Sequence, residues 1–288
     1  MATEDAQSAK RRGLLVRLTV APLVLGIALA LLWWHDRSGS SAPTDAILVV
    51  LAAGAAYECA VMLRVGGAPA SVPVAVVASA MLAGLGFVFP HDAATRAQAR
   101  GVLLAGSVVA VFVGHLRPVR PGDLAGLLGT LFPIVYVGFL LSLLRDAGDG
   151  PYGARMLALV VVASKASDIG GWLVGKTIGR HKMIPSVSPG KTWEGTVGGL
   201  AFSVAAAVLV RRLLFVGEGP AGGDLEVALF GLLLGVAAIL AGLTQSALKR
   251  RCGVKDSSTL LPEMGGLLDM ADSLLLAGPA TWLWVTLR

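Results

Sequence analysis

The chain has 288 residues, of which 55% are hydrophobic and 15% charged, and its mean hydropathy is +0.76. A soluble domain carries about 25% charged residues, so this composition excludes an ordinary water-soluble protein and indicates one embedded in a membrane. The net charge of +6 suits an anionic lipid surface. We expect no nucleic-acid partner, because no basic stretch is interleaved with aromatic residues.

Apolar runs long enough to cross a bilayer as helices recur along the chain. The predicted spans are 13–34, 46–63, 72–90, 101–116, 124–144, 154–175, 195–216, 226–248 and 266–287. The sequence therefore predicts nine spans. Eight or ten spans are also compatible with it, because the fourth predicted span is short and the last one begins in a polar motif. The fold class is therefore all-α, a polytopic helical membrane protein. We divide it into a cytoplasmic tail (1–12), N-terminal transmembrane helices (13–153) and a part that carries the polar motifs (154–288).

Basic residues in the connecting loops predict the orientation. With the N-terminus in the cytoplasm, 14 Lys and Arg lie on the cytoplasmic side, eight on the opposite side and two inside spans. The polar loops 176–194 and 249–265 then both face the cytoplasm, where nucleotides are found. We expect an integral protein of the inner (cytoplasmic) membrane of a bacterial cell, with its active site facing the cytoplasm.

The first polar motif lies at the end of the sixth predicted span. Lys165 and Asp168 are three residues apart and so share one face of a helix. Ionisable residues inside a span are costly and usually face a polar cavity or a partner. The alternative is a mutually neutralised pair that only holds helices together.

The second motif runs from Gly175 to Gly195 and is rich in Gly, Ser, Thr and Lys. Glycines allow close backbone approach, hydroxyls donate hydrogen bonds, and Lys191 supplies a point charge. These are the properties of a phosphate-binding loop that leads into a helix N-terminus. An ordinary basic cytoplasmic loop remains the alternative.

The third motif is the strongest and spans residues 246–273. Asp269 and Asp272 lie three apart on one helix face, and Asp256 lies a loop away. Mg²⁺ prefers such hard carboxylate oxygens and completes its shell with phosphates and water. The adjacent Lys249 and Arg250 would hold anionic substrate groups. The alternative is that Asp269 only caps the start of a helix and that the basic residues are solvated. This alternative is weaker, because a cap does not explain a second Asp inside an apolar helix.

This third motif resembles the signature of the phosphatidate cytidylyltransferase (CDP-diacylglycerol synthase) family. The matching positions, without a gap, are Ser246, Lys249, Arg250, Lys255, Asp256, Ser258, Leu261, Pro262, Gly265, Gly266, Leu267, Asp269 and Asp272. The second motif is similar to the family's S-P-x-K-T-x-E-G stretch, and Ser167-Asp168 to its upstream S-D. The resemblance covers about residues 165–273; upstream it rests on the span pattern and a local likeness around Glu58.

The resemblance implies a cytidylyl transfer from CTP to phosphatidic acid that gives CDP-diacylglycerol and pyrophosphate. It implies Mg²⁺ as cofactor, with a monovalent cation such as K⁺ as a further candidate, and membrane lipids as surroundings; a homodimer stays open. The expected metal ligands are Asp269 and Asp256, followed by Asp272 and Asp168. The expected phosphate-binding catalytic residues are Lys249, Arg250, Lys255 and Lys191. The residues expected to shape the nucleotide site are Ser188, Thr192, Glu194 and Ser246.

Two positions depart from the family pattern. Met264 stands where the family has His, and Met270 stands where it has Arg. The loss of a guanidinium removes a bidentate phosphate clamp, so the chain resembles a divergent branch. The alternatives are a CTP-dependent transferase or kinase for another lipid, such as an isoprenoid phosphate, and a non-catalytic scaffold or transporter.

Overall fold

The computed structural model describes residues 23, 26–116, 123–149, 152–215, 223–260 and 265–287. Within these ranges, residues 26–38 are helical and the later regular structure is helical apart from one hairpin. The helices are α2 (Ala42–Val65), α3 (Val72–Ala83), α4 (Leu85–Val88), α5 (Ala93–Gly114), α6 (Asp123–Pro133), η1 (Ile134–Phe139), α7 (Leu140–Leu144), η2 (Arg145–Gly148), α8 (Gly153–Thr177), α9 (Trp193–Leu214), α10 (Asp224–Arg251) and α11 (Leu267–Thr286). The hairpin consists of β1 (Lys182–Ile184) and β2 (Ser188–Thr192).

The polytopic helical fold is confirmed. Six stretches in the described part of the chain are long and apolar enough to cross a membrane, and each coincides with a predicted span. The third and last predicted spans also form helices, α3–α4 and α11. Much of the first predicted span and the whole 1–12 tail lie outside the described residues.

Two elements differ in detail from the predicted spans. The fourth helix begins at Ala93 rather than 101, because Asp92 caps it by accepting the Thr95 amide and because its arginines are buried by ion pairs. The fifth span continues through Pro133 as a π-helical turn over Ile134–Phe139. Proline removes one backbone donor, and a local widening of the helix accommodates that loss.

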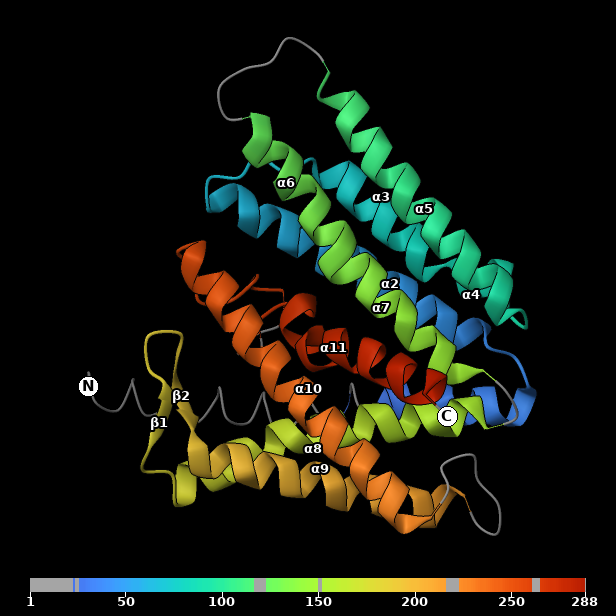
Figure 1. Ribbon diagram of the computed structural model, residues 1–288, viewed down its shortest axis with the longest axis vertical. Helices are drawn as coiled ribbons and strands as arrows, with labels where there is room; N and C mark the ends of the chain where they lie inside the picture. The colour runs from blue at the N-terminus through green and yellow to red at the C-terminus, as the bar shows by residue number, and fades with distance from the viewer. Residues whose placement is uncertain are drawn as a thin grey trace.

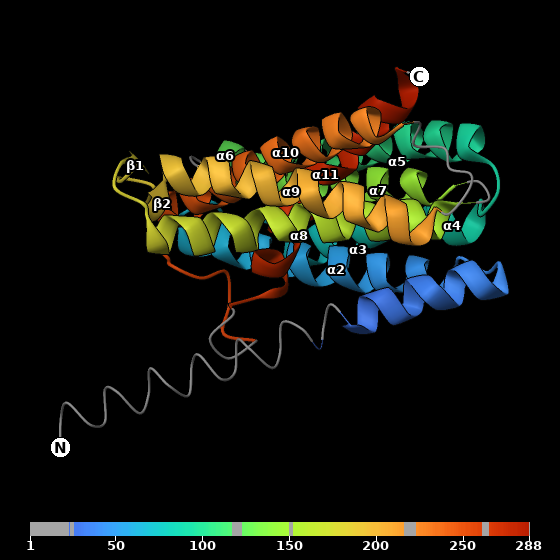
Figure 2. The same cartoon turned by 90° about the horizontal axis from the view of Figure 1, so that it is seen from below.

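The helices run roughly side by side, with β1–β2 at one end of the bundle and α4 at the other (Figure 2). α11 lies between the group of α2, α3, α5 and α6 and the group of α8, α9 and α10 (Figure 1). It packs against α2, α7, α8 and α10. Because α11 touches both groups, its N-terminus is held by helices from both halves of the chain.

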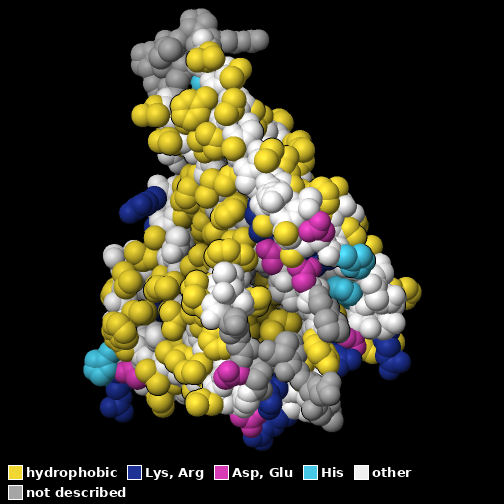
Figure 3. Space-filling view, turned by 45° about the vertical axis from the view of Figure 1, so that its right-hand side comes forward, with side chains coloured by type: hydrophobic (Ala, Val, Ile, Leu, Met, Phe, Trp, Pro, Cys, Tyr) yellow, Lys and Arg dark blue, Asp and Glu magenta, His cyan; other side chains and the backbone are white. Residues whose placement is uncertain are grey.

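Helices α8 and α9 pack closely because small residues face each other. A Cβ added to Gly195 would lie 2.6 Å from the carbonyl oxygen of Gly171, and one added to Gly199 would lie 2.8 Å from that of Ser167. Small residues at helix contacts let backbones approach in membrane bundles. Large apolar side chains remain exposed along the outer faces, and Figure 3 shows them covering much of the face in view. These surfaces are suited to contact with lipid tails.

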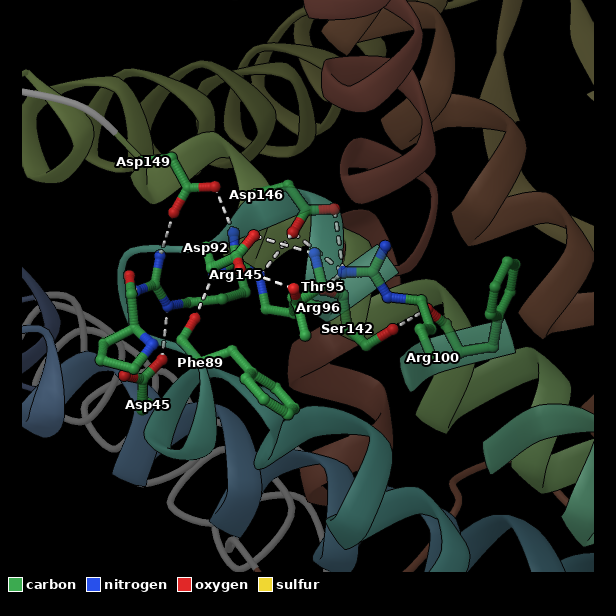
Figure 4. Close-up of polar contacts among 12 residues, drawn as sticks. Asp45, Phe89, Asp92, Thr95, Arg96, Arg100, Ser142, Arg145, Asp146 and Asp149 are labelled. Carbon is green, nitrogen blue, oxygen red and sulfur yellow. Dashed lines mark hydrogen bonds and ion pairs between the residues drawn. The ribbon is translucent and has the colours of Figure 1, made fainter. Parts of the chain in front are cut away.

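A network of buried ion pairs ties α2, α5 and η2 together with Asp149, which follows η2, at the end remote from the hairpin (Figure 4). Arg145 donates to Asp45 at 2.6 Å and to Asp149 at 2.9 Å. Arg96 donates to Asp146 at 3.0 Å and also to Asp149, and Arg100 contacts Asp146 at 2.8 Å. Three arginines thus face three aspartates, so the cluster is neutral overall.

Candidate active site

The predicted site residues come from four elements that meet at the hairpin end of the bundle. These are the C-terminal halves of α8 and α10, the hairpin β1–β2, and the N-terminal turns of α11 (Figure 1). Their side chains form two adjoining groups. We call these the lysine–aspartate cluster (Lys165, Asp168, Lys191, Asp272) and the Asp269 hub (Asp269, Gln245, Lys249, Ser257).

Lys165 joins α8 to α11 in the lysine–aspartate cluster. Its Nζ lies 3.8 Å from Asp168 Oδ2 and 3.7 Å from Asp272 Oδ1, and it donates to the Met270 carbonyl oxygen at 2.8 Å. The Lys165–Asp168 pair expected from the sequence therefore forms, and a second carboxylate from α11 joins it. A simple neutralised pair would need one aspartate, whereas here two carboxylates surround one ammonium group.

Lys191 reaches this cluster from β2. Its Nζ donates to the Ile239 carbonyl oxygen on α10 at 3.3 Å. A Cβ on Gly242 would lie 2.7 Å from that Nζ, so the glycine leaves room for the lysine. Burial lowers the pKa of Lys191; Asp168 and Asp272 raise it, and Lys249 lowers it further. The side chain is thus a half-buried cation near two carboxylates.

Asp269 accepts hydrogen bonds on both carboxylate oxygens. Oδ1 accepts from Lys249 Nζ at 2.7 Å and from Gln245 Nε2 at 3.2 Å. Oδ2 accepts from the amide and the hydroxyl of Ser257, each at 2.8 Å, and from the amide of Gly266 at 3.1 Å. Five donors therefore surround one carboxylate, which ties α10, the 255–258 loop and α11 together.

The glycines before α11 are required by this arrangement. Gly265 has a φ of +84°, which L side chains rarely adopt. A Cβ there would also collide with the Asp269 carboxylate, and one on Gly266 would collide with the Glu58 carboxylate. The Gly-Gly pair in the third motif therefore serves the geometry of the two acidic groups.

Three of the residues expected to shape a nucleotide site have identifiable local partners. Thr192 caps α9 by accepting the Gly195 amide at 3.1 Å. Glu194 accepts from the amides of Arg180 and His181, at 3.1 and 3.2 Å, and contacts the His181 ring at 2.6 Å. Ser246 donates back to its own helix at Gly242. Thr192 and Glu194 thus fix the hairpin on the start of α9.

The remaining predicted residues differ in exposure. Ser188 pairs with Ile184 in the hairpin and is half-buried. Arg250, Lys255 and Asp256 are exposed; Arg250 donates to the Val254 carbonyl oxygen at 3.3 Å. Met264 lies outside the described residues. The structure therefore brings Lys191, Lys249, Asp168, Asp269 and Asp272 into one region and leaves Arg250, Lys255 and Asp256 at its rim.

Sequence reasoning missed two members of the Asp269 hub and one residue beside it. Gln245 is a polar residue inside the apolar run of α10, four residues before Lys249, and that position could have identified it. Ser257 carried no distinctive signal. Glu58, buried on α2, accepts hydrogen bonds from the serines of the 255–258 loop and from the start of α11.

The carboxylates can be compared as metal ligands by the partners they already have. Among the described residues, no group of three or more His, Cys, Asp or Glu side chains is placed to hold a metal ion. Asp168 and Asp272 nevertheless form a pair around Lys165, and Mg²⁺ needs only one or two carboxylates when phosphates complete its shell. Asp269, with five donors around it, would have to give up hydrogen bonds to bind a metal.

The described cavities lie elsewhere. Two adjoining cavities of about 280 and 210 Å³ are lined by residues at the starts of α2 and α8, such as Asp45 and Gly153, and by His91, which precedes α5, and Arg145 of η2. α8 is 25 residues long, about 37 Å of helix. The cavities therefore belong to the ion-pair network end and contain none of the predicted site residues.

Comparison with known proteins agrees with this arrangement of polar motifs on a helical membrane scaffold. The model of the Cytidylyltransferase family matches residues 15–287. The match covers nearly the whole chain, and the protein therefore belongs to this family.

Individual relatives show how far the similarity extends. The chain is 36% identical over 160 residues to "Uncharacterized protein YnbB" of Escherichia coli, covering 56% of this chain and 51% of that protein. It is 36% identical over 168 residues to the phosphatidate cytidylyltransferase of Mycobacterium bovis (58% and 53% covered) and 39% identical over 154 residues to that of Haemophilus influenzae (52% of each). The matched region spans about half the length of these relatives.

Proposed function

We propose that this protein transfers the cytidylyl group of CTP to phosphatidic acid and so forms CDP-diacylglycerol. The observation that carries the proposal is the pairing of Asp168 and Asp272, from two different helices, beside the cations Lys165 and Lys191. Membership of the Cytidylyltransferase family and the names of the Mycobacterium and Haemophilus relatives support it.

The reaction requires charge neutralisation more than covalent help from the protein. A phosphate oxygen of phosphatidic acid attacks the α-phosphorus of CTP, a new P–O bond forms, and the bond to the β-phosphate breaks to release pyrophosphate. Both reactants are anionic, so positioned cations lower the barrier by bringing them together. Lys165 contacts both carboxylates. Lys191 lies close enough to feel the charges of both carboxylates and of Lys249, which Asp269 holds.

The carboxylate pair fits Mg²⁺. Asp168 and Asp272 would hold the ion, which would supply positive charge to neutralise the substrate phosphates. We assign Asp269 a different part, because its five hydrogen bonds make it an anchor for Lys249 and the 255–258 loop. Asp256, exposed at the rim, is a candidate to join the metal shell once substrate is bound.

Exposed positive charge favours a cytoplasmic position for the hairpin end. Basic residues exposed there are Lys176, Arg180, Lys182, Arg250, Arg251 and Lys255. At the other end, Arg96, Arg100, Arg145, Arg155, Arg211 and Arg212 are paired with aspartates. Lys and Arg in loops are enriched on the cytoplasmic side of membrane proteins, and exposed basic residues attract anionic lipids. We therefore place the site at the cytoplasmic face of an inner membrane; a homodimer and a K⁺ ion stay predictions.

A labelled-nucleotide assay tests the proposal. The purified protein in detergent micelles is incubated with Mg²⁺ and CTP labelled at either the α- or the γ-phosphate, in the presence of phosphatidic acid or an isoprenoid phosphate. We expect the α-label alone in a lipid product, formed with phosphatidic acid and lost when Mg²⁺ is chelated. Transfer of the γ-label would identify a kinase, and product with the isoprenoid phosphate only would identify another acceptor. Either result would contradict the proposal.

A further inference from the structure

A carboxylate from the N-terminal half of the chain reaches the third motif. Glu58 lies on α2 with only 3% of its surface exposed, and its partners are about 200 residues further along the chain. Oε1 accepts from the Ser258 hydroxyl at 2.7 Å and from the Leu267 amide at 3.0 Å. Oε2 accepts from the Ser257 hydroxyl and from the Leu268 amide, both at 2.9 Å. Both oxygens therefore connect the 255–258 loop to the start of α11.

The first turn of α11 needs such an acceptor. The amides that begin a helix have no partner within it, and the residue before α11, Gly266, has no side chain to supply one. Glu58 takes the next two amides, and Asp269 takes the Gly266 amide from inside the helix. A negative charge at this end is also favoured by the helix dipole. The position and direction of α11 thus depend on a residue of α2.

The Ser257 hydroxyl links the two carboxylates directly. Its oxygen lies 2.9 Å from Glu58 Oε2 and 2.8 Å from Asp269 Oδ2. A hydroxyl carries one hydrogen, so it donates fully to one carboxylate at a time. A change in the charge of Glu58 therefore changes how firmly Ser257, and with it the loop next to Asp256, is held against Asp269.

We propose that Glu58 is a positioning residue for cytidylyl transfer. It fixes the N-terminus of α11 and the 257–258 serine pair, and thereby the places of Asp269, Asp272 and the loop that carries Lys255 and Asp256. The inference rests on the proposed function for its reaction, but the contacts of Glu58 can be tested without it. Both carboxylate oxygens of Glu58 are occupied by the Ser257 and Ser258 hydroxyls and by the first amides of α11, so it acts through them.

The variant Glu58→Gln tests this role at nearly constant volume. The Gln side chain keeps one acceptor oxygen, but its NH₂ group replaces the other. That NH₂ group cannot accept a hydrogen bond from the hydroxyl and amide donors that it would face. We expect kcat to fall at least tenfold, with KM for CTP changed less than threefold. The shorter but charged Glu58→Asp should retain more activity than Glu58→Gln. Ser257→Ala, which removes the link and leaves the helix amides capped, should also lower kcat.

Asp45→Asn is the matched control, because Asp45 is also a buried carboxylate of α2 but pairs with Arg145. Measured below the unfolding temperature of each variant, Asp45→Asn should keep its kcat within twofold. Wild-type kcat in Glu58→Gln, or an equal loss of kcat in Glu58→Gln and Asp45→Asn, would overturn the proposal.

Amide hydrogen exchange of the same variants separates this inference from the proposed function. We expect faster exchange in residues 257–270 of Glu58→Gln and unchanged exchange there in Asp45→Asn. Unchanged exchange in Glu58→Gln would overturn the positioning role. If the wild-type protein formed no CDP-diacylglycerol but Glu58→Gln still loosened residues 257–270, the proposed reaction would fail while the contact between α2 and the motif would stand.

Discussion

Asp269 and Asp272 lie one turn apart on α11 but have different surroundings. Asp269 accepts five hydrogen bonds, from α10, the 255–258 loop and its own helix start. Asp272 contacts Lys165 at 3.7 Å and accepts the amide of Ser273. A carboxylate with few donors keeps lone pairs for a metal, whereas one with many donors acts as an anchor. The two residues should therefore respond differently to loss of charge.

We expect Asp272→Asn to abolish most Mg²⁺-dependent turnover without loosening the fold. The rate should fall well over tenfold, a loss beyond about 1.4 kcal/mol, while the unfolding temperature changes little. Asp269→Asn should lower the unfolding temperature as well, because it leaves Lys249 without its partner. Rate measurements and thermal unfolding of both variants check this. An Asp272→Asn protein that keeps more than about a tenth of the wild-type rate would exclude Asp272 as a principal ligand.

Met270 is the departure from the family pattern that the structure describes. Its side chain is half-buried, and its carbonyl oxygen accepts from Lys165 beside the carboxylate pair. An arginine there would add a bidentate phosphate clamp next to that pair. We therefore expect Met270→Arg to change the preference among lipid phosphates more than KM for CTP.

The acceptor panel described above measures the effect of Met270→Arg, with Met270→Leu as control. A buried arginine without a partner costs several kcal/mol, so thermal unfolding is measured first. If a folded Met270→Arg protein shows wild-type acceptor preference, Met270 is a packing residue, as its flexible apolar side chain also allows.

At the scale of elements, the hairpin β1–β2 carries Lys191 into the bundle. Thr192 and Glu194 fix it on α9, so the lysine at the end of β2 has a defined direction. The sequence favours a loop for the second motif, because its many Gly, Pro and Lys residues are uncommon in strands, so the two short strands could not be predicted from it. The antiparallel pairing of β1 with β2 across a short turn, together with the capping of α9, outweighs these low strand propensities.

The half-buried position of Lys191 predicts a pH dependence. Its pKa lies below the ordinary lysine value because burial disfavours the charged form. As pH rises through that lowered pKa, the side chain loses the charge that holds phosphate. The alkaline fall of kcat/KM should therefore begin at a lower pH than for an exposed lysine. In Lys191→Arg, where the guanidinium stays charged, this fall should move to higher pH.

A pH profile of kcat/KM, which reports on the free enzyme, measures the shift. Lys182→Arg is the control, because Lys182 is exposed on the same hairpin. An alkaline limb at the same pH in Lys191→Arg and in the wild type would assign the limb to another group.

At the scale of the whole molecule, hydropathy predicts the existence of the helices better than the residues at which they begin and end. Spans of Leu, Val and Ala indicate helices by length alone, whereas α5 extends eight residues beyond its predicted start, because Arg96 and Arg100 are neutralised by distant aspartates. The spacing on helix faces indicates Asp168, Asp269 and Asp272, the Gly- and hydroxyl-rich second motif indicates Lys191, and the family resemblance implies their roles. The contacts of Glu58 could not be predicted, because they join residues about 200 positions apart.

The two ends of the bundle also differ in how their charges are used. The end with the ion-pair network buries three arginines against three aspartates (Figure 4). Removal of one partner of a buried pair typically costs about 3–5 kcal/mol, so this network stabilises one arrangement of α2, α5 and η2. The hairpin end leaves several basic residues exposed, among them Lys182, Arg250 and Lys255. One end thus stabilises the fold, and the other is available to anionic ligands.

This asymmetry gives a direct test of orientation. Ser186 is exposed at the tip of the hairpin and His91 at the opposite end, while Cys59 and Cys252 are both buried and free. In intact cells, Ser186→Cys should resist a membrane-impermeant thiol reagent and react only after the cells are opened. His91→Cys should react from outside in intact cells. Buried thiols react poorly, so the wild-type protein supplies the background. Ready labelling of Ser186→Cys in intact cells would invert the topology and place the lysine–aspartate cluster on the side away from cytoplasmic CTP.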